Sequence, residues 1–225
     1  MVELSLGIDF GTTTTSIAFR EEGLFPEVLP IGENEVLYMP SAVAFIPESD
    51  GGYQTVIGED ALRVGVAADL ITSIKRCLGC DGSRCKSSQN TEGRPRATTP
   101  SLYNSGQCDA GRIRAGGRSW LPQEIALLIV EEALKRASHI LRTRYGVKDL
   151  EDLSVFPANL GCSTVFNLAQ RQAMVGIARS LGFGKVRLAN VVEEPIAAGV
   201  GFAYLEGLKP SRILVYDFGG GTLID

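Results

Sequence analysis

The chain has 225 residues, of which 44% are apolar types and 21% are charged, as in a soluble globular protein with one large domain or two modest ones. Its 22 lysines and arginines and 26 aspartates and glutamates give a formal net charge of -4, which offers no general electrostatic reason to expect nucleic-acid or membrane binding. No stretch is apolar enough to span a bilayer and the N-terminus lacks a signal-peptide pattern, so we expect a cytoplasmic protein.

The first part of the chain is predicted to begin with two strands joined by a tight turn. Residues 4–10 alternate apolar with small or polar types, residues 11–15 are Gly and Thr, and a returning strand contains residues 17–19. After these strands we expect two short strands and a helix, over residues 42–46, 55–57 and 59–70.

Residues 77–118 differ in composition from the rest of the chain. Gly, Ser, Asn, Pro and Arg dominate without a sustained period, which predicts a loop or an insertion. Residues 76–118 hold eight basic and three acidic side chains. This segment is therefore basic within an acidic chain.

Four of the five cysteines fall in the same segment with the spacing C-x2-C-x4-C-x22-C, at Cys77, Cys80, Cys85 and Cys108. Thiolates at such spacing can hold Zn²⁺, which would also order a polar loop. Redox-sensitive thiols are an equal alternative. A variable loop with incidental cysteines is preferred to both, because the glycine pattern of strong zinc ribbons is missing.

The second part of the chain alternates helices and strands. Apolar residues at helical spacing predict a long helix over residues 122–145. The only histidine, His139, falls on its polar side, so histidine-dependent triads and His-rich zinc centres are poor candidates. The other expected elements are strands over 153–157, 186–188 and 213–217, a helix over 194–204, and a helix over 164–181 with Val165, Leu168, Ala169, Ala173 and Ile177 inward. This alternation implies βαβ units and an α/β architecture.

A short motif occurs near both ends of the chain, at residues 7–14 and 215–222. Each copy places an aspartate, Asp9 or Asp217, at the end of a strand, followed by Phe-Gly and a Gly/Thr turn. Such a turn can direct successive backbone amides at phosphate oxygens, while the aspartate can hold Mg²⁺ directly or through water. Two such turns facing each other would clamp a polyphosphate with the metal between them.

The order of these motifs resembles the DnaK-type seventy-kilodalton heat-shock chaperone family. The first phosphate motif, the Ser-Ile-Lys-Arg segment at residues 73–76, the Ala-Gln-Arg-Gln-Ala run at 169–173, the Glu-Glu-Pro-Ile-Ala-Ala-Gly element at 193–199 and the second phosphate motif carry the resemblance. It implies one lobe, with βαβ units, of an actin-like (ribonuclease H-like) ATPase fold, here truncated before the second lobe. Residues 1–212 would form the first lobe, with the insertion at about 77–118, and residues 213–225 would open the second.

The resemblance also assigns roles to individual residues. Catalytic roles would fall to Lys75, Glu194 and Thr12, and Asp9 and Asp217 would hold Mg²⁺ through water. A relay of nucleotide state to a substrate domain would use Pro157 and Arg171. The nucleotide phosphates would contact Gly11, Thr12, Thr13, Gly219, Gly220, Gly221 and Thr222.

The implied function is ATP binding and Mg²⁺-dependent hydrolysis, coupled to a peptide-binding domain that is absent here. Expected partners are ATP or ADP, unfolded peptides and co-chaperones, with association through the exposed 213–225 strand and an inactive isolated chain. Two departures mark a divergent member: Ile224 where the family usually has aspartate, and Thr14 in place of a common tyrosine. A sugar or metabolite kinase and a non-catalytic ATP-sensing protein stay open as alternatives, because kinship of fold does not settle function.

Overall fold

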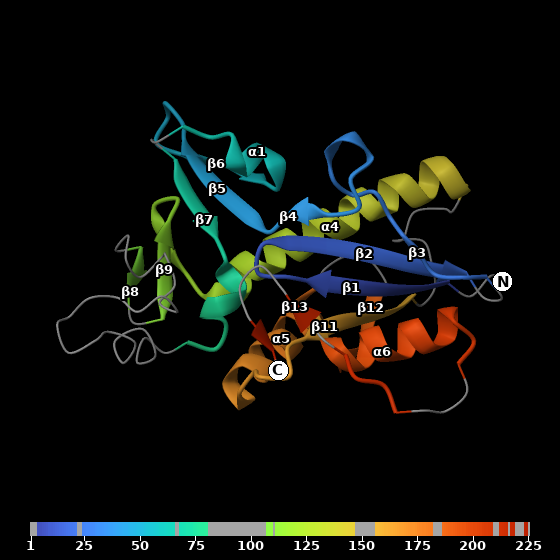
Figure 1. The fold of residues 1–225 in the computed structure, drawn as a ribbon. Helices are drawn as coiled ribbons and strands as arrows, with labels where there is room; N and C mark the ends of the chain where they lie inside the picture. Colours follow the sequence, from blue (N-terminus) through green and yellow to red (C-terminus); the bar gives the residue numbers. More distant parts are fainter. Residues whose placement is uncertain are drawn as a thin grey trace.

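Figure 1 shows the computed structural model of the chain, a mixed α/β fold built on one large sheet. It describes residues 4–21, 24–65, 68–80, 107–109, 111–146, 156–181, 186–208, 212–215, 217–218 and 223–224. No helix within these ranges has the length and apolar character needed to cross a membrane.

The large sheet has the described strand order β12-β11-β1-β2-β3, with β4 also paired to β2. Strand β1 is antiparallel to β2 and parallel to β11, which is parallel to β12, so the carboxyl ends of β1, β11 and β12 lie at one edge. The strands are β1 (Leu4–Phe10), β2 (Thr14–Glu21), β3 (Glu27–Val28), β4 (Met39–Pro40), β11 (Phe156–Cys162) and β12 (Val186–Glu193).

Helix α5 (Leu168–Ser180) connects β11 to β12, and this unit confirms the predicted βαβ arrangement. Helix α6 (Glu194–Leu205) follows β12 directly and also contacts β11 and β12. The side chains of Ala158, Leu160 and Cys162 are buried in the core together with Met174 and Ile177 of α5. Because strand side chains alternate, Asn159 and Gly161 lie on the other face of β11.

Helix α4 (Pro122–Tyr145) confirms the long predicted helix and packs along the large sheet (Figure 1). It begins with proline in its first turn and with a hydrogen bond of 2.6 Å from the Leu121 amide to the Glu124 carboxylate, and it ends before Gly146 at φ 62°. Its buried stripe is Ile125, Ala126, Ile129, Val130, Ala133, Leu134, Ala137 and Leu141. His139 is on the exposed side, as predicted.

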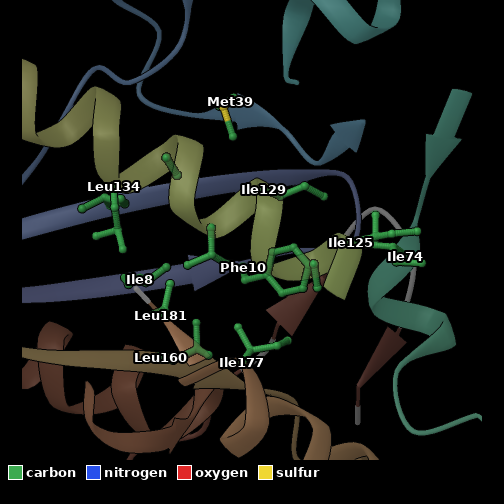
Figure 2. Close-up of a cluster of buried hydrophobic side chains, with 14 of the residues drawn as sticks. Ile8, Phe10, Met39, Ile74, Ile125, Ile129, Leu134, Leu160, Ile177 and Leu181 are labelled. Atoms are coloured by element: carbon green, nitrogen blue, oxygen red, sulfur yellow. The ribbon is translucent and has the colours of Figure 1, made fainter. Parts of the chain in front are cut away.

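The main core forms where this stripe meets the sheet and α5. Figure 2 shows Ile8 and Phe10 of β1 between the helix α4 side chains and those of Leu160, Ile177 and Leu181. Phe10 is fully buried, although the residues on either side of it, Asp9 and Gly11, reach the surface. The strand that ends in the first phosphate motif is therefore anchored by its apolar face.

Two smaller antiparallel sheets extend from this body. One has the order β6-β5-β7 and the other the order β10-β9-β8. Their elements, with the short helices beside them, are β5 (Ala42–Pro47), β6 (Tyr53–Ile57), α1 (Glu59–Leu62), β7 (Asp69–Thr72), β8 (Cys108–Asp109), β9 (Arg112–Ala115), β10 (Arg118–Trp120), η1 (Glu33–Glu35) and η2 (Ile74–Cys77).

Several predicted boundaries are wrong. The helix expected over 59–70 ends at Leu62, and 69–72 form β7, whose backbone pairs with β5. The loop expected up to residue 118 is wrong at its end, because residues 108–120 include three strands of a sheet; the extent of the insertion stays a prediction. Residues 81–106 lie outside the described part.

The second half also differs from the prediction at two places. Helix α5 begins at Leu168 rather than at 164, and Val165, Leu168 and Ala169 are exposed, whereas Ala173 and Ile177 are buried as expected. Residues 213–215 are not in a strand; the short strand β13 (Asp217–Phe218) pairs with β14 (Leu223–Ile224).

Arg136 of α4 ties the β6-α1 segment to the main body. Its guanidinium donates to Glu59 Oε2 at 2.7 Å and to Glu132 Oε1 at 3.0 Å, and also to the carbonyl of Ile31 at 3.1 Å. Burial raises the pKa of the Glu59 carboxyl, but hydrogen bonds from Arg136 and from backbone amides outweigh it and hold this pKa below the ordinary value of 4.5.

We predict that Arg136→Met destabilises the fold by about 3 kcal/mol, because it leaves the Glu59 carboxylate partly buried without its cation. A carboxyl whose pKa is depressed on folding contributes stability above its unfolded pKa, and this is lost as pH falls through the folded value. The difference in Tm between wild type and Arg136→Met should therefore have its full size at pH 7 and become smaller as the pH falls below about 4.5.

Trp120, the only tryptophan, packs against Phe45 and would report the unfolding transition by fluorescence. Lys135→Met is the matched control, because Lys135 pairs with Glu132 at the exposed surface. A Tm difference for Arg136→Met that does not change with pH would contradict the role assigned to Glu59.

Candidate functional site

The turn between β1 and β2 is the first part of the site. The Gly11 amide donates to the Thr14 carbonyl at 2.9 Å, and a Cβ atom at Gly11 would lie only 2.4 Å from that oxygen. The Thr13 carbonyl accepts a hydrogen bond of 2.8 Å from the Ser41 amide, so the turn is also held from outside. Thr12 is half-buried and Thr13 exposed at this turn. The backbone is therefore fixed in a tight turn, and position 11 has room only for glycine, which has no side chain.

Asp9 lies on the exposed face of β1, one residue before the buried Phe10 and paired across the hairpin with Ser16. Its carboxylate is thus at the carboxyl edge of the sheet beside the turn. In the described residues no group of three or more His, Cys, Asp or Glu side chains could enclose a metal. A single carboxylate beside a phosphate turn fits Mg²⁺, which keeps most of its waters, better than a metal enclosed by protein ligands.

Lys75 and Glu194 form the second part of the site, although they lie 119 positions apart in sequence. The Nζ atom of Lys75 is 2.5 Å from Glu194 Oε1, and the two side chains are only 7% and 20% exposed. The centroids of the Phe10 and Phe166 rings are 6.0 and 5.9 Å from the Nζ atom of Lys75. The structure therefore brings together two of the three residues predicted to be catalytic, in a largely apolar setting where charge interactions are strong.

The backbone around Lys75 is held in an unusual conformation. Lys75 lies in the single turn η2, which starts after Ser73 at φ 57°, a left-handed value that is uncommon for serine. On the other side, Gly79 has φ 62°, and a Cβ atom there would lie 2.5 Å from the carbonyl carbon of Ala169. The segment that carries Lys75 is thus packed closely against the start of α5.

Gly161 has a role that the sequence reasoning missed. A Cβ atom at this position of β11 would lie 3.2 Å from Glu194 Cγ and 3.4 Å from the Ile8 carbonyl oxygen. Absence of a side chain therefore leaves room for Glu194 over the sheet. The signal available in the sequence was a glycine inside a strand, which often marks a close approach.

Arg171 connects this site to α5. Its guanidinium donates to the carbonyl oxygens of Thr164 and Phe166, each at 3.1 Å, and to Glu193 Oε1 at 2.8 Å. Pro157 is at the opposite end of β11, about 17 Å from Cys162 by strand geometry, with Cys162 paired to Glu193. The predicted relay through Pro157 and Arg171 stays a prediction, and Arg171 contacts Glu193 and the segment that follows Cys162.

Cys162 ends β11 in the core next to these charges. Burial raises the pKa of its thiol, which the charges of Glu194 and Glu193 also raise and those of Arg171 and Lys75 lower. The thiol is therefore protonated at neutral pH, and Cys162 is a core residue.

Part of the predicted site lies outside the described residues. Gly219, Gly220, Gly221, Thr222 and Cys85 are not described, and of Asp217 only the backbone in β13 is. Of the other predicted zinc ligands, Cys77 is buried and Cys80 and Cys108 are partly exposed. The second phosphate turn and the zinc hypothesis therefore stay predictions.

Comparison with known proteins extends over almost the whole chain. The family model described as Hsp70 protein matches residues 5–224. The chain is also similar to the chaperone protein DnaK of Thermotoga neapolitana, with 29% identity over 222 residues. That alignment covers 98% of this chain and 29% of the relative, so the chain spans under a third of the length of that protein.

We predict that Gly79→Ala lowers Tm, because alanine would be strained at φ 62° and its Cβ would overlap the backbone of α5. The matched control is Gly176→Ala inside α5, where a Cβ atom would meet nothing within 4 Å. That control should raise stability by about 0.5–1 kcal/mol. An unchanged Tm for Gly79→Ala would contradict the close packing described for this segment.

Proposed function

Because this chain belongs to the Hsp70 family, we propose that it forms the first lobe, residues 1–212, of a domain that binds and hydrolyses ATP. The observation that carries the proposal is the largely buried ion pair of Lys75 and Glu194. It lies at the edge of the sheet where β1 ends and the β1–β2 turn begins. Residues 213–225 would begin a second lobe, and Asp217 and the turn at 219–222 would complete the phosphate clamp.

The proposed chemistry is an attack of water on the γ-phosphoryl group of ATP. Phosphoryl transfer requires mainly positioning and charge stabilisation, and little covalent chemistry from the protein. Lys75 would stabilise the charge that develops on the phosphoryl oxygens, and the Glu194 carboxylate would orient the water and accept its proton. Amides of Thr12 and Thr13 would donate to the phosphates, whereas the Gly11 amide is already bonded to the Thr14 carbonyl.

A magnesium ion fits this arrangement next to Asp9, where it would neutralise charge on the phosphates. Glu194 is exposed to 20%, which allows water to reach its carboxylate while the sheet and the rings of Phe10 and Phe166 surround Lys75. The Lys75 ammonium is therefore already in position before the reaction. Stabilising the transition state then requires less reorganisation than it would with an exposed ammonium.

We also propose that nucleotide state is passed from this site to a peptide-binding domain in a longer cytoplasmic protein, whose partners would be unfolded peptides and co-chaperones. Arg171 supports a role in that transfer, since it links α5 to Glu193, the residue next to Glu194. A shift of Glu194 on nucleotide binding would move the start of α6 and, through Glu193, pull on α5.

The first test is Lys75→Ala in the protein expressed from its complete reading frame. We expect hydrolysis to fall at least about a hundredfold, because the ammonium acts mainly in the transition state, while the Kd for Mg-ATP changes little. Single-turnover hydrolysis and calorimetric titration measure the two quantities. Lys135→Ala, at an exposed position of α4, is the control that should leave both unchanged. Wild-type hydrolysis in Lys75→Ala would refute the assignment.

The second test concerns the 225-residue chain alone, which we expect to bind Mg-ATP weakly and not to hydrolyse it, because it carries only the first strands of the second lobe. Its tail is expected to promote association, since Leu214 is 89% exposed and α6 has Ile196, Val200 and Phe202 exposed. Val215 packs on α6, with its Cγ2 atom 3.2 Å from a Cβ position at Gly199.

Titration with Mg-ATP and light scattering check both expectations. Leu214→Asp should reduce the scattering, whereas Leu62→Asp, an exposed leucine on α1, should not. Micromolar affinity from a strict monomer would show that the first lobe is sufficient.

A further inference from the structure

Ser163, the residue after β11, has a buried hydroxyl group without a partner among the described residues. It is 4% exposed, and within the described part of the chain its Oγ atom is the buried side-chain oxygen for which no hydrogen bond is found. A hydroxyl in that condition costs about 1–3 kcal/mol unless a water or a ligand bonds to it.

The residues on both sides of Ser163 border the ion pair of Glu194 and Lys75. The side chains of Leu160 and Cys162 point into the core, so Gly161 is on the opposite face, where its absent Cβ atom faces Glu194 at 3.2 Å from Cγ and 3.6 Å from Oε1. Phe166, three residues after Ser163, places its ring 5.9 Å from Lys75 Nζ. Ser163, which follows the end of β11 at Cys162, therefore lies in a short segment that borders the ion pair of Glu194 and Lys75 at both ends.

The backbone around Ser163 is fixed by other bonds. Its carbonyl accepts from the Phe166 amide at 3.2 Å and lies 3.6 Å from the Cys162 thiol, and Arg171 holds the carbonyls of Thr164 and Phe166. Phe166, in turn, contributes the ring 5.9 Å from Lys75 Nζ. The hydroxyl is therefore held on a rigid turn that also lines the ion-pair site.

We propose that the Ser163 hydroxyl, together with the Glu194 carboxylate, holds the water molecule that attacks the γ-phosphoryl group. This inference rests on the proposed ATP hydrolysis and adds a catalytic residue to it. A hydroxyl can both accept and donate a hydrogen bond, so it can bind water next to a carboxylate without adding charge.

In the step, the oxygen of this water forms a bond to the γ-phosphorus. The bond from the γ-phosphorus to the bridging oxygen breaks, and its electron pair leaves with ADP. One proton of the water passes to the Glu194 carboxylate, which afterwards releases it to solvent or to phosphate. Ser163 keeps its own proton and only orients the water.

The test compares Ser163→Ala with Ser41→Ala in the protein from its complete reading frame. Ser41 is likewise buried, but its hydroxyl bonds to Thr15 Oγ1 at 2.9 Å inside the protein. We expect Ser41→Ala to lower Tm, because it leaves the Thr15 hydroxyl without its partner. We expect Ser163→Ala to leave Tm unchanged or to raise it, and to slow single-turnover hydrolysis about tenfold or more while the Kd for Mg-ATP stays within about twofold.

A crystal structure with ADP would give a second reading that does not depend on activity. It should show a water within hydrogen-bonding distance of Ser163 Oγ and of the Glu194 carboxylate in the wild type, and no such water in Ser163→Ala. Ser163→Thr, which keeps the hydroxyl, should restore hydrolysis.

The possible failures can be told apart. If wild-type protein does not hydrolyse ATP, both the proposed function and the role of Ser163 fall. If Lys75→Ala loses hydrolysis but Ser163→Ala keeps it within twofold, only the role of Ser163 is overturned. A lower Tm together with weaker ATP binding in Ser163→Ala would show that the hydroxyl is structural, and would also overturn its role in holding the attacking water.

Discussion

The apolar stripe of α4 is the constraint on which the rest of the structure depends. This helix contacts β2 of the large sheet, β5 and β6 of the second sheet, η2 and α5. Eight of its residues form the buried stripe, and Phe10 and Ile8 of β1 pack against it (Figure 2). Because η2 carries Lys75 and β1 ends at the phosphate turn, the same helix that closes the core also sets where the two parts of the site lie.

The position of the ion pair follows from that packing, from two residues with positive φ and from one glycine inside a strand. Ser73 is left-handed, Gly79 has positive φ against α5, and Gly161 leaves space for Glu194. Holding a cation and a carboxylate where they are only 7% and 20% exposed has a desolvation cost, which good geometry and neighbouring hydrogen bonds have to offset. The pair is therefore better explained as a preorganised site than as a stabilising contact.

The sequence predicted the features that repeat with a regular period or recur as a motif. Helical spacing identified α4, alternation identified β1, and the resemblance to a family identified Lys75 and Glu194, which lie 119 residues apart in sequence. Prediction from the sequence failed where tertiary contacts, and not a local pattern, determine the secondary structure. Residues 69–72 pair with β5, which no local periodicity shows, and α5 starts after a turn that Arg171 holds through two carbonyls.

Ser163 could not be predicted for a related reason, and the sequence signal for Gly161 was no more than a glycine inside a strand. Their importance comes from what the other strands and helices place next to them, not from the residue type at a fixed spacing. A serine in a strand-to-helix connection is common, and this one is distinguished by its burial without a partner in the described part of the chain.

The two adjacent carboxylates at the start of α6 connect these parts. Glu193 bonds to Arg171 of α5 and Glu194 to Lys75 of η2, so consecutive residues of one backbone reach in different directions. The first pair is over a third exposed and contributes little stability, whereas the second is largely buried. A ligand that takes Lys75 away from Glu194 would therefore change the more buried of the two pairs, and the bond of Glu193 to Arg171 connects the start of α6 to α5.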